Sequence, residues 1–226
     1  MKILNILSGI LILISSTVIL ADVSADVSQL QTRWAEVNYL LKDKEQKSAF
    51  EQLVVHADNV VLANTNSTEA LIWRGVIKAS FAGAKSAIDF TAMSLAKSAK
   101  RDFEKALTMD KHALQGSSYT NLGVLYYKVP GWPIGFGDEG KAKEYLQKAL
   151  AIDSIGIENN YFYADYLIEQ RQYSEAEKYL LKAKSAPSRL NRPVADEGRK
   201  DEIARALDNV RSHLKAKNNA SITDRR

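Results

Sequence analysis

Small and large apolar residues recur at a fixed distance along the second half of the chain. Three of them return one repeat later with the same mutual spacing: Ala142, Leu146 and Ala149 reappear as Ala176, Leu180 and Ala183. An earlier copy of the same spacing reads Ala99, Phe103 and Ala106. Positions separated by four and then three residues share one face of an α-helix, so each copy predicts a helix with a narrow apolar stripe.

Apolar stripes of helical period predict helices along most of the chain. The expected ranges are 29–41, 46–62, 70–82, 87–107, 118–128, 138 or 140 to 152, 160–170, 174–184 and 193 to about 217. Gly83 and Ala84 are expected to break the third and fourth of these apart. With 4 Pro and 11 Gly in 226 residues, the composition also favours helix over sheet.

A period of about 34 residues with this pattern of residue types is the signature of tetratricopeptide (TPR) repeats. We therefore predict an all-α fold, a TPR-like α-solenoid of antiparallel helix pairs with a C-terminal capping helix. The expected domain spans 26–217, with its clearest repeats at 118–153 and 158–187 and degenerate units within 46–111. Residues 218–226 are expected to form a frayed tail.

Two departures from the regular repeat stand out. In the regular pair, the small residue at the helix crossing is Ala164 and the next repeated alanine is Ala176. The corresponding separation from Gly75 to Ala99 is twice as long. The latter unit therefore contains about three extra helical turns, and either Gly75 or Ile77 could mark its crossing. In the next unit the separation from Gly123 to Ala142 is also longer than the regular one, and the extra residues form an aromatic, glycine-rich loop.

The N-terminus has the pattern of a secretory signal peptide at 1–25. A basic start at Lys2 precedes an uncharged apolar run over 3–20, and Val23-Ser-Ala25 is a good cleavage site. Cleavage after Ala21 is the next choice, and an uncleaved membrane anchor is the alternative. The chain has no cysteine, which excludes disulfides and a lipid anchor on an N-terminal Cys. We expect an exported, periplasmic protein, in contact with a membrane only if this segment is retained.

Charge and motifs exclude several functions. The formal charge is +4, and the C-terminal segment carries all of this excess. Basic and acidic residues alternate there, which is typical of a solvated helix face, so we expect no nucleic-acid partner. His56, His112 and His213 have no second metal-type ligand at helical spacing, and neither a nucleophile elbow nor a phosphate loop is present. We predict a protein that is not an enzyme and needs no cofactor or metal.

The loop over 130–140 is the first candidate binding element. It carries Trp132 and Phe136, and exposed aromatics on a loop held by rigid helices are typical of recognition sites. The alternative is structural: both rings fold back and fill the gap that the longer loop leaves.

The concave face of the solenoid is the second candidate. In a TPR pair this face is lined by first-helix residues three before, one after and four after the crossing residue. The two clear repeats give Thr120, Val124, Tyr127, Tyr161, Asp165 and Ile168. The surface is apolar and aromatic with an acidic end, which suits an apolar helix, an extended peptide or a small ligand with an apolar body.

Part of the chain resembles a subgroup of exported bacterial TPR proteins. The segments Leu122-Gly-Val-Leu-Tyr126, Pro130-Gly-Trp-Pro-Ile-Gly-Phe-Gly-Asp138, Asn160-Tyr-Phe-Tyr163 and Pro193-Val-Ala-Asp-Glu-Gly-Arg199 look like the T component of tripartite periplasmic (TRAP) transporters. The resemblance implies a partner such as a periplasmic solute-binding protein, and a hydrophobic ligand in the pore. Members of that group are often lipid-anchored, and the absence of cysteine departs from this pattern.

Two functions follow from these features. The first is a periplasmic, non-catalytic TPR scaffold that binds another exported protein or peptide. The second is a small-molecule or lipid-binding accessory component of a TRAP-type transport system.

Overall fold

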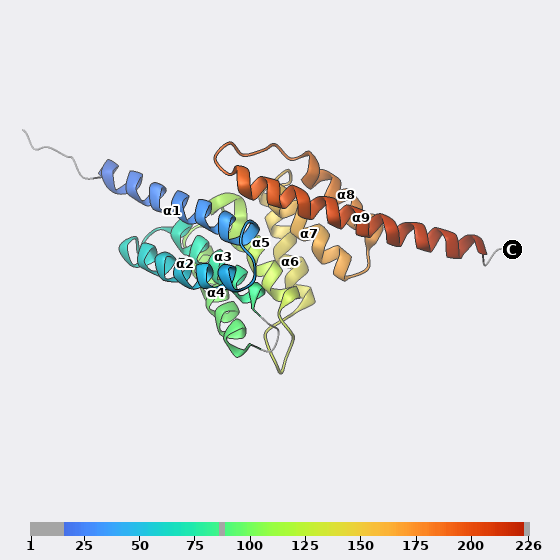
Figure 1. Cartoon of the computed structure of the whole chain (residues 1–226), viewed down its shortest axis with the longest axis horizontal. Helices are drawn as coiled ribbons and strands as arrows, with labels where there is room; N and C mark the ends of the chain where they lie inside the picture. The colour runs from blue at the N-terminus through green and yellow to red at the C-terminus, as the bar shows by residue number, and fades with distance from the viewer. Residues whose placement is uncertain (1–15, 86–88, 224–226) are drawn as a thin grey trace, which may run out of the picture.

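α-Helices form nearly all of the computed structural model, which describes residues 16–85 and 89–223. In chain order they are α1 (Ser16–Tyr39), α2 (Asp43–Ala63), α3 (Thr68–Ala84), α4 (Phe90–Met109), α5 (Ala113–Lys128), α6 (Glu139–Ile152), α7 (Ile157–Glu169), α8 (Tyr173–Ser185) and α9 (Pro193–Thr223). Short turns join successive helices, which pack as antiparallel pairs stacked along the chain (Figure 1). The predicted all-α, TPR-like α-solenoid is confirmed.

The repeated apolar residues form the contact between the two helices of a pair. Ala142 and Leu146 on α6 have no exposed surface, and a Cβ on Gly123 of α5 would lie 2.6 Å from Leu146 Cγ. The same Cβ would lie 3.2 Å from the carbonyl oxygen of Ala142. Gly123 therefore allows α5 and α6 to approach more closely than any side chain would permit.

Gly75 marks the corresponding crossing between α3 and α4. A Cβ at Gly75 would lie 2.7 Å from Phe103 Cε1, which repeats the arrangement of Gly123 and Leu146. The charged neighbours Arg74 and Lys78 fit this buried face because they are paired. Asp102 on α4 accepts Arg74 Nη2 at 2.6 Å and lies 3.6 Å from Lys78 Nζ, with its own side chain only 8% exposed.

The extra turns of this unit are divided between two helices. α3 and α4 contain 17 and 20 residues, whereas α7 and α8 contain 13 each. The expected break at Gly83 is wrong: α3 continues through it to Ala84, since one helical glycine costs only about 1 kcal/mol. α4 begins at Phe90, with Asp89 as its N-cap, and the expected start at Ala87 lies outside the described residues.

The two end helices are longer than the apolar pattern predicts. α1 begins at Ser16 rather than near 29, so it includes part of the predicted signal peptide; residues 1–15 of that segment lie outside the described residues. α9 continues past 217 to Thr223, and residues 224–226 are not described.

The capping helix α9 contacts both halves of the solenoid. Its residues Ile203, Leu207 and Val210 are buried in the apolar cluster formed by the helices from α3 onward. Ala195, near its start, belongs instead to the cluster formed by α1, α2 and α3. The backbone of α9 also passes the ring of Tyr39, so that the first and last helices lie against each other (Figure 1).

Candidate functional site

The loop between α5 and α6 is held in one conformation by backbone hydrogen bonds. The Gly137 N–H donates to Pro130 O at 2.9 Å, and the Asp138 N–H donates to Tyr126 O at 2.8 Å. A Cβ at Gly137 would lie 2.0 Å from Val129 O, so the loop closes only with glycine there. Asp138 also caps α6 by accepting the Lys141 N–H at 2.9 Å.

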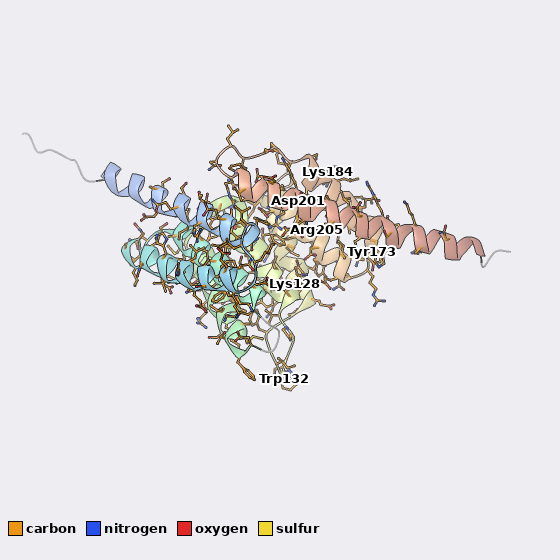
Figure 2. The ribbon with its side chains drawn as sticks, in the orientation of Figure 1. Lys128, Trp132, Tyr173, Lys184, Asp201 and Arg205 are labelled. Carbon is orange, nitrogen blue, oxygen red and sulfur yellow. The ribbon has the colours of Figure 1, made fainter. Side chains whose placement is uncertain are left out.

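The two aromatic residues of the loop have different environments. Phe136 folds back and packs edge-on against Tyr126, with ring centroids 5.8 Å apart. Trp132 is 89% exposed at the tip of the loop (Figure 2), and Ile134 is 72% exposed. Phe136 therefore fills the gap left by the longer loop, as the structural alternative expects, whereas Trp132 is exposed and can contact a partner.

The start of α4 adds a third apolar side chain to this region. Phe90 is 95% exposed, and Met93, one turn further along α4, has its Cε 3.0 Å from the position of a Cβ on Gly135 in the loop. We call Phe90, Trp132 and Ile134 together the Trp132 patch. Large apolar residues are seldom grouped at such exposure without a function.

The predicted groove residues are distributed over two regions. Thr120 is 2% exposed, and its hydroxyl donates to Asn159 Oδ1 at 2.6 Å. Tyr161 is half-buried beneath α9, whose Arg199 guanidinium lies 4.4 Å from the ring centre. Burial, only partly offset by Arg199, raises the pKa of Tyr161 to about 12. α9 therefore covers one end of the expected groove.

The acidic end of the groove forms a polar contact between α5 and α7. The hydroxyl of Tyr127 donates to Asp165 Oδ2 at 2.7 Å, and Lys128 Nζ lies 3.0 Å from the same oxygen. Burial and the charge of Asp165 raise the pKa of Tyr127 well above its ordinary value. Val124 and Ile168 are half-buried. Lys128 therefore balances the negative charge that the sequence places here.

A cavity of about 700 Å³ lies on the inner face of the solenoid. Its walls come from α1, α3, α5, α7, the turn between α6 and α7, and the segment that leads into α9, with Ile152 at the end of α6 and Arg199 of α9. Trp34, Trp73 and Phe162 supply aromatic surface, Val76 supplies aliphatic surface, and Thr120 is the one predicted groove residue that lines it. This volume falls in the range of small-molecule sites in proteins.

Charged residues at one end of the cavity attach α9 to α7. Glu158 lies 3.1 Å from Arg189 Nη2 and 2.8 Å from Arg199 Nε, the latter a close ion pair rather than an aligned hydrogen bond. Although burial opposes ionisation, Arg199 and then Arg189 hold the pKa of Glu158 below its ordinary value. Arg189 also donates to Asp196 Oδ1 at 2.8 Å.

A third arginine at the cavity lacks such a partner. Arg192 forms no hydrogen bond or ion pair through its side chain with any residue that the structure describes, and its Nε is buried. Its guanidinium stacks over the indole of Trp73, with Cζ 5.0 Å from the ring centre. Burial, and then repulsion from Arg189, lower the pKa of Arg192 below its ordinary value.

No local pattern in the sequence indicates this cavity. Its wall residues come from five separated segments, and Trp34 and Trp73 lie on apolar stripes that indicate only core packing. Arg192 precedes Pro193 in a turn, where nothing in the local pattern distinguishes it from a solvated charge.

The described part of the chain offers neither a metal cluster nor a membrane-spanning helix. No group of three or more His, Cys, Asp or Glu side chains is arranged to hold a metal ion in the ranges 16–85 and 89–223. Within the same ranges, none of the helices is both long enough and apolar enough to cross a membrane.

The stacked pairs, their small-residue crossings and the capping α9 define the class of protein as a TPR-like α-solenoid. Two solved structures are similar to the chain. One, titled "Crystal structure of MamA", shares 17% identity at a TM-score of 0.42 and covers 78% of this chain and 95% of its own. The other, "Crystal structure of MamA protein", shares 16% identity at a TM-score of 0.42, covering 85% and 96%. Structural similarity at this sequence identity and TM-score says nothing about function.

No protein-family model and no curated protein sequence matches the chain.

Proposed function

We propose that this protein is a non-catalytic TPR-like scaffold that binds another exported protein or peptide through the Trp132 patch. The observation that carries the proposal is the exposure of Phe90, Trp132 and Ile134 on a loop and helix end whose backbone is fixed. A preorganised loop loses little conformational entropy on binding, and tryptophan is enriched among the few residues that dominate the energy of protein interfaces. Complete burial of one such side chain contributes roughly 1.5–3 kcal/mol.

The cellular location in this proposal is the periplasm. It is supported by the basic, apolar and small-residue segments of the predicted signal peptide over 1–25. A solute-binding protein is one partner of the expected kind.

The test compares partner recovery by three tagged proteins from periplasmic extract under mild conditions. We expect the wild type and Leu190→Ala to recover the same stoichiometric partner, and Trp132→Ala to lose it. Leu190 is 100% exposed and lies on the loop before α9, so it is a matched apolar control away from the patch. All three should melt at the same temperature, because neither side chain is packed.

Equal recovery with Trp132→Ala would contradict the role of the patch. Failure of every variant to recover a partner would contradict the scaffold function itself. Co-sedimentation with lipid vesicles, lost in Trp132→Ala but not in Leu190→Ala, would instead assign the patch to a membrane surface.

A second candidate function is favoured by the cavity. An inner volume of about 700 Å³ with aromatic walls suits an accessory ligand-binding component of a TRAP-type transport system. Native mass spectrometry of gently purified protein tests it: a bound small molecule released on denaturation supports ligand binding, and a bare mass counts against it.

A further inference from the structure

The wall of the cavity combines apolar surface with one unbalanced positive charge. Trp34 and Trp73 pack edge-on with ring centroids 5.6 Å apart, and Phe162 adds aromatic surface from α7. Trp34 Nε1 donates to Ser80 Oγ at 2.8 Å, whereas the buried Trp73 Nε1 has no acceptor among the residues that the structure describes. The aromatic walls would therefore contact an apolar ligand, and one of them also offers a free donor.

The other charged groups that line the cavity are already engaged. Asp153 accepts the N–H groups of Ile155 and Gly156 at 3.2 and 2.9 Å, which leaves it as the cap of the turn before α7. Glu158 is shared between Arg189 and Arg199, as described above. Among the lining cations, Arg192 alone has no counter-charge in contact within the described part of the chain.

A half-buried guanidinium without an acceptor is unfavourable, because burial removes its hydrogen bonds to water and no protein acceptor replaces them. The indole of Trp73 compensates only in part, because a cation–π contact is weaker than a charge-assisted hydrogen bond. An acceptor that enters the cavity would remove this deficit. It would need one negative charge, since Arg192 is the one lining cation whose charge no described residue in contact balances.

We infer that the cavity binds a small amphiphilic monocarboxylate, with its carboxylate on Arg192 and its apolar body against Trp34, Trp73 and Phe162. This inference concerns the ligand of the second candidate function, rests on that function, and is independent of the Trp132 patch. The chemical class is set by two requirements: an apolar chain that fills part of 700 Å³ and a single planar anion that a guanidinium can bind through two hydrogen bonds.

The experiment measures binding of decanoate and of decan-1-ol to the full chain, expressed with its own N-terminal segment and then purified. Isothermal titration calorimetry gives the affinity, and the ligand-dependent change in tryptophan fluorescence reports on Trp34 and Trp73, since the third tryptophan, Trp132, does not line the cavity. We expect decanoate to bind at least about tenfold more tightly than the alcohol, because a hydrogen bond to a charged group exceeds its neutral equivalent by this amount.

Two arginine variants locate the anion. Arg192→Met should weaken decanoate binding at least about tenfold and leave decan-1-ol unchanged. Arg211→Met is the matched control, because Arg211 pairs with Glu177 on the exposed side of α9 and does not line the cavity. It should bind both ligands as the wild type does. A melting curve for each variant separates binding from folding: Arg192→Met should melt no lower than the wild type, since it removes an unpaired cation.

Several outcomes would overturn the inference. Equal affinity for decanoate and decan-1-ol would reject the anionic class and leave ligand binding by the cavity intact. Binding of neither ligand, with the wild type folded, would reject the amphiphile altogether. If Arg192→Met lowers the melting temperature and weakens both ligands equally, Arg192 is structural. Tighter binding of inorganic phosphate or of a short apolar peptide with a free C-terminus would assign the cavity to a different ligand.

Discussion

Single small residues decide how closely the helices of a pair approach. At Gly123 a Cβ would already fall within 2.6 Å of Leu146, so any larger side chain must push α5 away from α6. At Gly83 the same added atom meets nothing within 4 Å among the residues that the structure describes. The two glycines have the same intrinsic helix propensity, but a side chain at Gly123 would clash with the facing helix and one at Gly83 would not.

This contrast gives a prediction at the residue scale. Gly123→Leu should lower the free energy of unfolding by about 1–3 kcal/mol through overpacking. Gly83→Leu, the matched control, should leave it unchanged or raise it by up to about 1 kcal/mol, because leucine is the better helix former. Urea denaturation measures both. Equal effects of the two substitutions would mean that Gly123 is not at the crossing.

The sequence could locate this residue because packing constraints leave a local trace. A small residue at helical spacing from a buried stripe identified Gly123 correctly. Gly75 remained ambiguous because Arg74 and Lys78 beside it suggest an exposed face. Their acceptor, Asp102, is 28 residues from Arg74, and no local pattern reveals a pairing over that distance.

At the scale of elements, the loop between α5 and α6 shows how backbone geometry presents a side chain. A bridge between Gly131 and Gly137 closes the loop, Val129 O leaves no room for a side chain at Gly137, and Trp132 is exposed between the two bridged residues. The sequence predicted a longer loop with aromatic residues. It could not tell which ring would turn inward, because that depends on Tyr126 of the preceding helix accepting Phe136 as a neighbour.

We predict that Gly137→Ala opens this loop without unfolding the protein. A methyl group 2.0 Å from Val129 O must break the closure, so the amide hydrogens of Gly137 and Asp138 should exchange faster with solvent. Gly131→Ala is the control, since its Cβ would lie at an ordinary 3.4 Å from Gly137 O. Hydrogen exchange read by mass spectrometry distinguishes them. Unchanged protection in Gly137→Ala would show that the closure does not hold the loop.

At the scale of the whole molecule, α9 packs on α8 and also contacts α1 and α7. Tyr39 and Tyr161 are half-buried in this contact, where Tyr39 lies 3.5 Å from Glu202 and Tyr161 lies under Arg199. Burial is the largest contribution to the pKa of each phenol and raises it above the ordinary value of 10.0. The apolar stripe of α9 predicted a capping helix, but not that its N-terminal turns reach back to the first helix.

Stability at alkaline pH tests this attachment. In the unfolded chain these phenols ionise near pH 10.0, whereas in the folded chain they stay protonated, Tyr161 up to about pH 12. Their stabilising contribution is therefore complete below pH 10 and is lost as the pH rises through this window, by up to about 1.4 kcal/mol per pH unit for each phenol. Urea midpoints measured from about pH 9 to about pH 11.5 should therefore fall.

The variant Tyr161→Phe should show a shallower fall than the wild type over the same range. Tyr163→Phe would serve as a control, because Tyr163 packs against Tyr179 within the α7–α8 pair rather than against α9. A pH profile of Tyr161→Phe that is identical to the wild type would place the alkaline transition elsewhere.

The contact between Tyr39 and α9 also limits how this architecture can grow. Repeat arrays usually lengthen by duplicating a unit at either end, since each unit touches only its neighbours. Here an additional helix pair would separate α1 from α9 and expose Tyr39 and Ala195, which now cover each other's helices. The contact between the first and last helices thus ties the number of helix pairs to the span that α9 can cover, and a longer array would need a different cap.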